Sequence, residues 1–179
     1  MIPDSSTRRR ATVAALQATL CAGLIALLSL ATRMPFLFPA LGASAFILIA
    51  FPKAPAAAPR NVIGSHLVGA AAGWACFRLF GLEAGGATLV AGGGWQHVCA
   101  AALALGLTTG LLLRFDLLHP PAGATTLIVS LGFLPHAWQI AMVGVSAVLL
   151  LVLVRVVARS QAASPSGAPK DREPGEEVA

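Results

Sequence analysis

Six apolar stretches follow one another along the chain, separated by short polar segments. A helix needs about 20 residues to cross a hydrocarbon core of ~30 Å, and four of the stretches reach that length. These four are Ala11–Ala31, Asn61–Phe80, Trp95–Leu113 and Ala137–Val157. The other two, Phe36–Phe51 and Pro120–Leu134, are shorter and carry proline at or near their start. The pattern predicts an all-α membrane protein, a bundle of four long spans plus two short broken or half helices.

The two short stretches resemble each other. Pro39-Ala-Leu-Gly-Ala-Ser-Ala aligns with Pro120-Pro-Ala-Gly-Ala-Thr-Thr at an offset of 81 residues, and each copy lies between two long stretches. We therefore expect two long–short–long repeats, at about residues 11–80 and 95–157. A basic N-terminus (1–10) precedes this domain, and a charged, proline-rich tail (158–179) that we expect to be disordered follows it.

Small residues recur at a spacing of four in two of the long stretches, as Gly69/Gly73 and Gly106/Gly110. This spacing lets helix backbones approach closely, because glycine has no Cβ. It predicts tight packing of two helix faces.

Composition supports the membrane interpretation. The chain is 57% hydrophobic and 11% charged, whereas soluble domains carry about 25% charged residues. The Arg8-Arg9-Arg10 cluster precedes a 21-residue apolar run, longer than the roughly 7–15 residues of a signal peptide's core, so this run is expected to be the first membrane helix. The other basic residues stand singly, without a basic face interleaved with aromatics, which argues against nucleic acid as a partner.

The positions of the basic residues predict an orientation. If both short stretches cross, ten of the 12 Lys and Arg residues lie on one side and two, Arg33 and Arg78, on the other. If both are re-entrant, the division is eight against four. The positive-inside rule favours six crossings, with the repeats inverted. Either arrangement predicts a multi-pass protein of the plasma (inner) membrane with both termini cytoplasmic.

The starts of the short helices are where we expect function. Proline suits the first turn of a helix, and the segments Gly42-Ala43-Ser44 and Gly123-Ala124-Thr125 follow it with small residues and a hydroxyl. Unpaired amides and the positive end of the helix dipole would make such a terminus an anion site, as in repeat-built transporters. The alternative is a kinked, tightly packed helix without a ligand.

Three polar positions and one neighbour join this candidate site. His119 precedes Pro120, which holds its backbone extended. It either lines an entrance or binds a proton, or else it caps the helix or lies in the membrane interface. His66 lies six residues into its span, where ionisable groups usually face the bundle interior; the alternative is a packed, hydrogen-bonded neutral histidine. Arg60, followed by Asn61, stands at a helix start that disfavours positive charge; it either attracts an anion or anchors the topology.

Other chemistry finds no support in the sequence. The three cysteines lie in apolar runs without CxxC, and the four histidines lack HxxxH or HxxE spacing, so neither a metal site nor a cofactor is expected. No nucleophile–base set, P-loop or GxGxxG is present, which argues against an enzyme. Between residues 11 and 157 the acidic residues are Glu83 and Asp116, both in expected loops.

Two motifs resemble the HPP family of integral membrane proteins: Leu118-His119-Pro120-Pro121-Ala122-Gly123-Ala124-Thr125, and Pro59-Arg60-Asn61-Val62-Ile63-Gly64-Ser65-His66-Leu67. The resemblance covers about residues 11–157. It implies a multi-spanning protein, usually described with four helices, and a transport role that some plastid and cyanobacterial members direct at nitrite. Ala58 and Lys53 depart from the family pattern.

Together these observations predict a transporter or channel for a small anion, with nitrite as the leading candidate. The alternative is a membrane scaffold or accessory subunit that transports nothing. The expected partners are the lipid bilayer, the anion and, since a chain of only six elements encloses little space, a second copy in a homodimer.

Overall fold

The structure, a computed structural model, describes residues 5–84 and 93–163. The regular elements of this part are all helical, as the sequence predicts. They are α1 (Ser5–Thr32), α2 (Ala40–Ala50), η1 (Pro55–Ala57), α3 (Pro59–Leu79), η2 (Leu82–Ala84), α5 (Trp95–Arg114), α6 (Ala122–Ser130) and α7 (Trp138–Ala163).

Long and short helices alternate as expected. The helices α1, α3, α5 and α7 are long and apolar enough to cross a membrane. At 1.5 Å per residue, α2 and α6 are only about 16 and 14 Å long, too short to cross a ~30 Å core alone. The prediction of four long spans and two short helices in a membrane bundle is confirmed.

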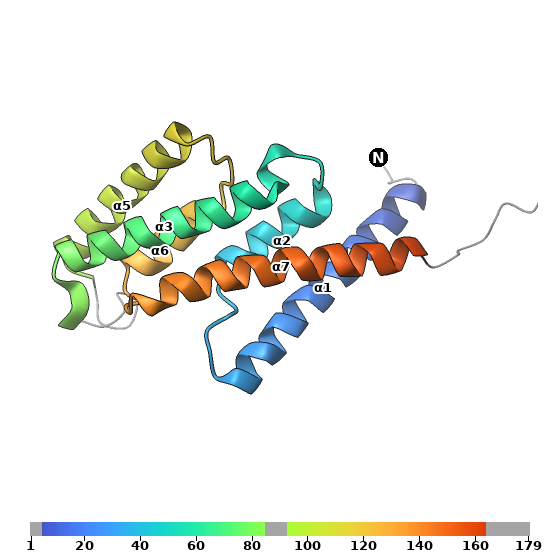
Figure 1. Cartoon of the computed structure of the whole chain (residues 1–179), viewed down its shortest axis with the longest axis horizontal. Coiled ribbons are helices and arrows are strands. Elements are labelled where there is room, and N and C mark those ends of the chain that lie inside the picture. The colour runs from blue at the N-terminus through green and yellow to red at the C-terminus, as the bar shows by residue number, and fades with distance from the viewer. Residues whose placement is uncertain (1–4, 85–92, 164–179) are drawn as a thin grey trace, which may run out of the picture.

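The short helices lie within passes from one end of the bundle to the other. In Figure 1, α1 and α3 run in the same general direction, and α5 and α7 run in the opposite one. The linker before α2 and α2 itself together therefore carry the chain from the end of α1 to the distant start of α3. The linker before α6 and α6 do the same between α5 and α7. This is the chain path that six crossings with inverted halves require.

The two halves interlock. The second short helix, α6, packs against α5 of its own half and against α3 of the other half. The first short helix, α2, packs against α1 of its own half and against α7 of the other. Each short helix is thus covered by the last long helix of the opposite repeat.

Glycines set the closest of these approaches. A Cβ on Gly69 would lie 2.8 Å from the Ala122 carbonyl oxygen, and one on Gly73 would lie 2.6 Å from the Thr126 carbonyl oxygen. The first predicted glycine pair therefore lets α3 contact the backbone of α6. Gly106 and Gly110 of α5 meet nothing within 4 Å among the described residues, so the second pair has no packing role within that part of the chain.

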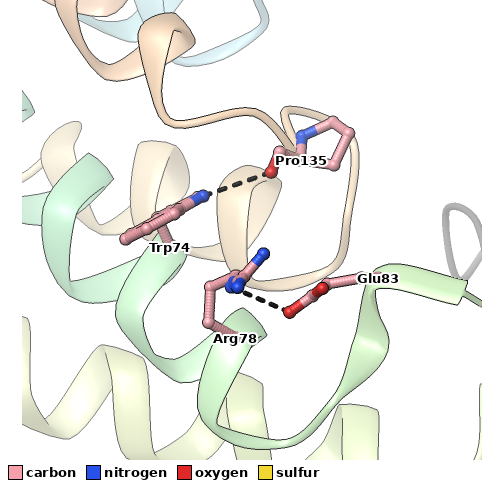
Figure 2. A network of polar contacts seen from close by, with 4 residues as sticks. All are labelled: Trp74, Arg78, Glu83 and Pro135. Carbon is pink, nitrogen blue, oxygen red and sulfur yellow. Dashed lines mark hydrogen bonds and ion pairs between the residues drawn. The ribbon is translucent and has the colours of Figure 1, made fainter.

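The C-terminal part of α3 is tied to two neighbouring segments (Figure 2). The Trp74 indole N–H donates to the Pro135 carbonyl oxygen at 3.1 Å, across to the loop before α7. Arg78 pairs with Glu83 of η2, with 2.8 Å between Nε and Oε1, and its guanidinium carbon lies 5.6 Å from the centre of the Trp74 ring. The Arg78–Glu83 pair is about half exposed, so it orients the turn more than it stabilises it.

Two predicted boundaries differ. The helix α1 already begins at Ser5, so the basic cluster expected as a separate N-terminus belongs to the first helix. The helix α7 continues to Ala163, so the tail predicted to be disordered from residue 158 is helical over its first residues. The rest of that predicted tail, residues 164–179, lies outside the described part.

Candidate functional site

Four polar side chains meet in the interior of the bundle. They are Ser44 of α2, His66 of α3, His119 of the linker between α5 and α6, and Thr125 of α6, and each is at most 1% exposed. The Ser44 hydroxyl oxygen lies 2.8 Å from Nε2 of His66 and 2.9 Å from Nε2 of His119. Nδ1 of His66 lies 2.7 Å from the Thr125 hydroxyl oxygen. We call these residues the His–Ser cluster.

The cluster joins the two repeats through one ring. Ser44 and Thr125 are equivalent in the repeat alignment, and they bond the two nitrogens of the same imidazole, that of His66. Phe38 and His119 are also equivalent, and both place their rings edge to face with His66, at centroid distances of 6.0 and 5.1 Å. The internal repeat thus surrounds His66 with two matched pairs of side chains.

The hydrogen bonds of the cluster determine which atom of each pair is the donor. Nδ1 of His119 lies 2.7 Å from the Ala56 carbonyl oxygen, which can only accept, so Nδ1 carries the hydrogen. In a neutral ring, Nε2 of His119 then accepts from the Ser44 hydroxyl. Ser44 has no second proton, so it accepts from Nε2–H of His66, and Nδ1 of His66 accepts from Thr125. Both tautomers follow from this network.

Contacts from α3 hold the linker that carries His119. The Ser65 hydroxyl donates to the Leu117 carbonyl oxygen at 3.1 Å. A Cβ on Gly64 would lie 3.1 Å from the Leu117 side chain, which is buried there. The helix that supplies His66 therefore also sets the position of His119.

Arg60 and Asn61, both predicted at the site, lie outside the cluster. Arg60 is exposed and donates to the carbonyl oxygens of Phe115 at 2.9 Å and Asp116 at 3.3 Å, just past the end of α5. A cation is favourable there, because the end of a helix carries unpaired carbonyls and the negative end of its dipole. The guanidinium that the sequence offered as an anion attractor thus binds backbone carbonyls.

Asn61 holds η1, the segment on the other side of His119. Its side-chain amide donates to the Pro55 carbonyl oxygen at 2.9 Å, in the segment whose next carbonyl, that of Ala56, accepts from His119. Asn61 thereby orients the acceptor that fixes the His119 tautomer. Neither Ala56 nor Phe38 was predicted at the site. Phe38 could have been found from the repeat, because it is equivalent to His119 at the offset of 81 residues. Ala56 could not, because it contributes a backbone carbonyl, which every residue has.

The first amides of the short helices are not open, contrary to expectation. The Gly42 N–H donates to the Pro39 carbonyl oxygen at 3.1 Å. In the second copy, Gly123 and Ala124 donate to the carbonyl oxygens of Pro120 and Pro121 at 3.0 and 3.1 Å. Pro39 and Pro121 already have helical backbone angles, so a tight turn satisfies these donors before the regular helix begins.

The remaining small residues of the predicted motif lie away from the cluster. Gly42, Ala43 and Ala124 are exposed in the single chain, and Gly123 is partly exposed. Of the two predicted tripeptides, only the hydroxyl residues, Ser44 and Thr125, face the interior. The structure therefore gathers the hydroxyls and histidines and leaves the glycine and alanine positions on the outside.

Two hollows border equivalent segments of the repeats. One of about 340 Å³ lies between α5 and the following linker and is lined by His119, Pro120, Gly123, Thr108 and leucines. Another of about 500 Å³ borders Phe38 and Pro39 of the first half and the far end of α6. Both linings are mainly apolar, so these hollows suit neutral or weakly hydrated solutes better than a bare charge.

The other two histidines do not join the cluster. His136 is exposed and stacks on Trp138, with ring centroids 6.3 Å apart. His97 is buried, and neither ring nitrogen has a hydrogen-bond partner among the described residues. Within residues 5–84 and 93–163, no three His, Cys, Asp or Glu side chains are arranged to hold a metal ion.

The comparisons with known proteins agree with the motifs. The chain matches the family described as HPP, transmembrane region, over residues 3–165. It is also 34% identical over 105 residues to a protein of Dictyostelium discoideum named as a transmembrane protein, a match that covers 58% of this chain and 33% of the relative. The chain thus spans about a third of that relative's length. No solved structure matches. This chain is a multi-pass integral membrane protein, and it belongs to the HPP family.

Proposed function

We propose that the protein is a transporter or channel for a small anion, with nitrite as the leading candidate, and that the His–Ser cluster is where the solute is recognised. The observation that carries the proposal is the burial of two histidines and two hydroxyls, joined by hydrogen bonds, between the two halves of a membrane bundle. The proposed function needs neither catalysis nor a cofactor.

The location of the cluster supports transport. Ionisable side chains within membrane segments are expensive and usually mark a solute or proton pathway. Transporters built from inverted repeats bind their solutes where short or broken helices of the two halves meet. Here the short helices α2 and α6 each contribute one hydroxyl to the same ring of α3.

The chemistry of the cluster favours an anion over a cation. The side chains are hydroxyls and imidazoles, which donate hydrogen bonds, and imidazole can also become positively charged. The described part of the chain has two acidic side chains, Glu83 and Asp116, and both are exposed. A solute cation would therefore find no carboxylate in the cluster.

The bilayer orientation is part of the same proposal. Lys53, Arg60 and Arg114 lie in or beside the linkers α2–α3 and α5–α6, whereas Arg33 follows the end of α1 and Arg78 lies in the last turn of α3. By the positive-inside rule, the first group faces the cytoplasm together with both termini, in a plasma (inner) membrane.

Reconstitution tests the function. Purified protein in liposomes is offered a panel of small anions, nitrite included, and uptake is compared with that of protein-free vesicles. We expect anion uptake by the wild-type protein and its loss in the Ser44→Val/Thr125→Val double variant. Ser146→Ala is the matched control, because Ser146 is an equally buried serine that bonds only within α7, to the Met142 carbonyl oxygen at 2.8 Å. Normal uptake by a folded double variant would remove the cluster from the proposal.

The second candidate is a scaffold or accessory subunit. It is favoured by the exposed Gly106/Gly110 face of α5, which is free within the described residues to take a neighbouring helix. This function predicts stable co-purification with another membrane protein and no flux of any anion in liposomes. A second copy of the chain on this face would give a homodimer instead, and the mass of the detergent-purified protein separates the two.

A further inference from the structure

The Ser44 hydroxyl has two acceptors within reach and one proton to give. Its oxygen lies 2.9 Å from Nε2 of His119 and 3.2 Å from the carbonyl oxygen of Ala40, one turn earlier in α2. In the neutral cluster the proton must point at His119, because otherwise Nε2 of that ring would be a buried acceptor without a donor. The Ala40 carbonyl oxygen then receives no hydrogen bond from this hydroxyl.

Adding one proton to Nε2 of His119 reverses this choice without breaking the network. Nε2–H of His119 would donate to Ser44, Nε2–H of His66 would continue to donate to Ser44, and the Ser44 O–H would turn to the Ala40 carbonyl. The Thr125 and Ala56 contacts would be unchanged. A single hydroxyl rotation thus converts one fully bonded arrangement into another.

His66 does not offer the same possibility. A proton on its Nδ1 would make both Nδ1 and Nε2 donors, and Thr125 would have to accept from Nδ1. The Thr125 hydroxyl proton would then need a new acceptor, and among the described residues its oxygen contacts only His66. The two histidines are thus unequal, although they lie against each other with centroids 5.1 Å apart.

We propose that the cluster binds one proton, at Nε2 of His119, with Ser44 as the hydroxyl switch, and that this proton travels with the anion. The second half of the statement rests on the proposed function; the first half does not. The proton comes from the aqueous phase and returns to it, so no redox partner is needed.

The surroundings explain why the anion and the proton would depend on each other. Within the described part of the chain, His66 is the one other titratable side chain that contacts His119, and α2 and η1 present Ser44 and the Ala56 carbonyl. Thr108, Thr109 and leucines of α5 line the hollow beside His119, and the buried side chains of α7, such as Gln139 and Ser146, do not titrate.

The nearest ionised side chains by sequence, Arg60, Arg114 and Asp116, are exposed on the outer ends. An imidazolium in this setting lacks a counter-charge, and burying an unpaired charge is costly. An anion in the hollow beside His119 would supply the counter-charge, so each raises the affinity for the other. The pair is also neutral overall, which suits the apolar lining.

Proton binding is tested on the purified full chain. Side-chain ¹⁵N NMR of histidine-labelled protein, assigned with His66→Asn and His119→Asn variants, reports the tautomer and charge of each ring. We expect Nδ1–H for His119 and Nε2–H for His66 at alkaline pH, and the charged form on His119 first as the pH falls. Ser44→Ala should lower the proton affinity of His119 about tenfold, since a charge-assisted hydrogen bond is about twice as strong as a neutral one. Protonation at His66 first, or an unchanged affinity in Ser44→Ala, would overturn the switch.

Coupling is tested in liposomes that contain a pH dye, with nitrite as the probe. Uptake through the protein, after subtraction of protein-free vesicles that account for diffusion of nitrous acid, should acidify the lumen by one proton per anion. Uptake without acidification overturns the coupling and leaves the anion transporter standing. Absence of uptake of every anion, together with a titrating His119, overturns the proposed function and with it the coupling, while the proton site stands. Ser146→Ala should behave as the wild type in both assays.

Discussion

Ser44 and Thr125, which occupy the same position in two repeats 81 residues apart, bond opposite nitrogens of one imidazole. A symmetric pair of hydroxyls thus holds an asymmetric ring, whose nitrogens must differ in protonation when it is neutral. The two residues therefore play different parts in spite of their equivalence. Thr125 donates to His66, whereas Ser44 accepts from it.

Loss of either hydroxyl should destabilise the protein, and loss of Ser44 should cost more. Thr125→Val keeps the shape and leaves Nδ1 of His66 buried without a donor, for which we expect about 1–3 kcal/mol of lost unfolding free energy. Ser44→Ala removes the partner of two nitrogens at once and should exceed that value. The measurement is a denaturant titration of the detergent-solubilised protein.

Ser146→Ala serves as the control for these variants, with an expected change within about 1 kcal/mol, because its hydroxyl only bonds back to its own helix. A Ser44→Ala protein as stable as Ser146→Ala would show that the cluster contributes nothing to folding.

Arg60 should act on stability and not on anion attraction. Arg60→Ala removes two hydrogen bonds that tie the linker after α5 to α3, and it should lower the unfolding free energy by about 1–2 kcal/mol. Lys53→Ala removes an exposed charge from the linker between α2 and α3, without a contact of this kind, and should leave stability within ~0.5 kcal/mol. Anion uptake at saturating concentration is compared in Arg60→Ala and Lys53→Ala. An equal loss of uptake in both variants, without a change in stability, would indicate that surface charge is the shared cause. It would contradict the structural role of Arg60.

The two glycine pairs should respond in opposite ways to the same substitution. Gly73→Ala places a methyl 2.6 Å from the backbone of α6, so α3 and α6 must separate, at a cost of about 1–3 kcal/mol. Gly110→Ala meets open space in the chain and should be neutral or up to about 1 kcal/mol stabilising, through helix propensity. Thermal unfolding of the two purified variants makes the comparison. A destabilised Gly110→Ala would indicate that a partner covers this face.

Chemical labelling tests the number of crossings. Arg33 follows α1 and Lys53 follows α2, so six crossings place them on opposite sides of the bilayer, and a re-entrant α2 places them on the same side. With Cys21, Cys76 and Cys99 replaced by alanine, Arg33→Cys and Lys53→Cys are offered an impermeant thiol reagent in intact and in opened cells. We expect Arg33→Cys to react in intact cells and Lys53→Cys only after opening. Reaction of both in intact cells contradicts six crossings.

Much of the fold could be predicted because its signals are local. Length and hydropathy indicated each long helix, proline and glycine marked the short ones, and repeat order indicated that the halves correspond. Ser44 and Thr125 were selected as hydroxyls at the starts of the short helices, His119 as the residue before Pro120, and His66 as an ionisable group inside a span. The structure brings all four together.

The rest depended on contacts that no local pattern encodes. The sequence suggested Arg60 as an anion-attracting residue, but in the structure it donates to the carbonyl oxygens of Phe115 and Asp116, which are distant in the sequence. The sequence suggested that the amides of Gly42 and Gly123 are unpaired, but in the structure they donate to the carbonyl oxygens of the preceding prolines, which form a tight turn. In each case the sequence identifies a donor, and only the three-dimensional arrangement identifies its acceptor.

The crossed packing of the short helices has a consequence for biogenesis. Because α2 is covered by α7 and α6 by α3, neither repeat can complete its packing when it alone has left the ribosome. His66 enters the bilayer before Thr125 and His119, two of its neighbours, have left the ribosome. During that interval the His66 imidazole is in the membrane without those partners. The insertion machinery or water must form hydrogen bonds with its ring until the second repeat packs against it.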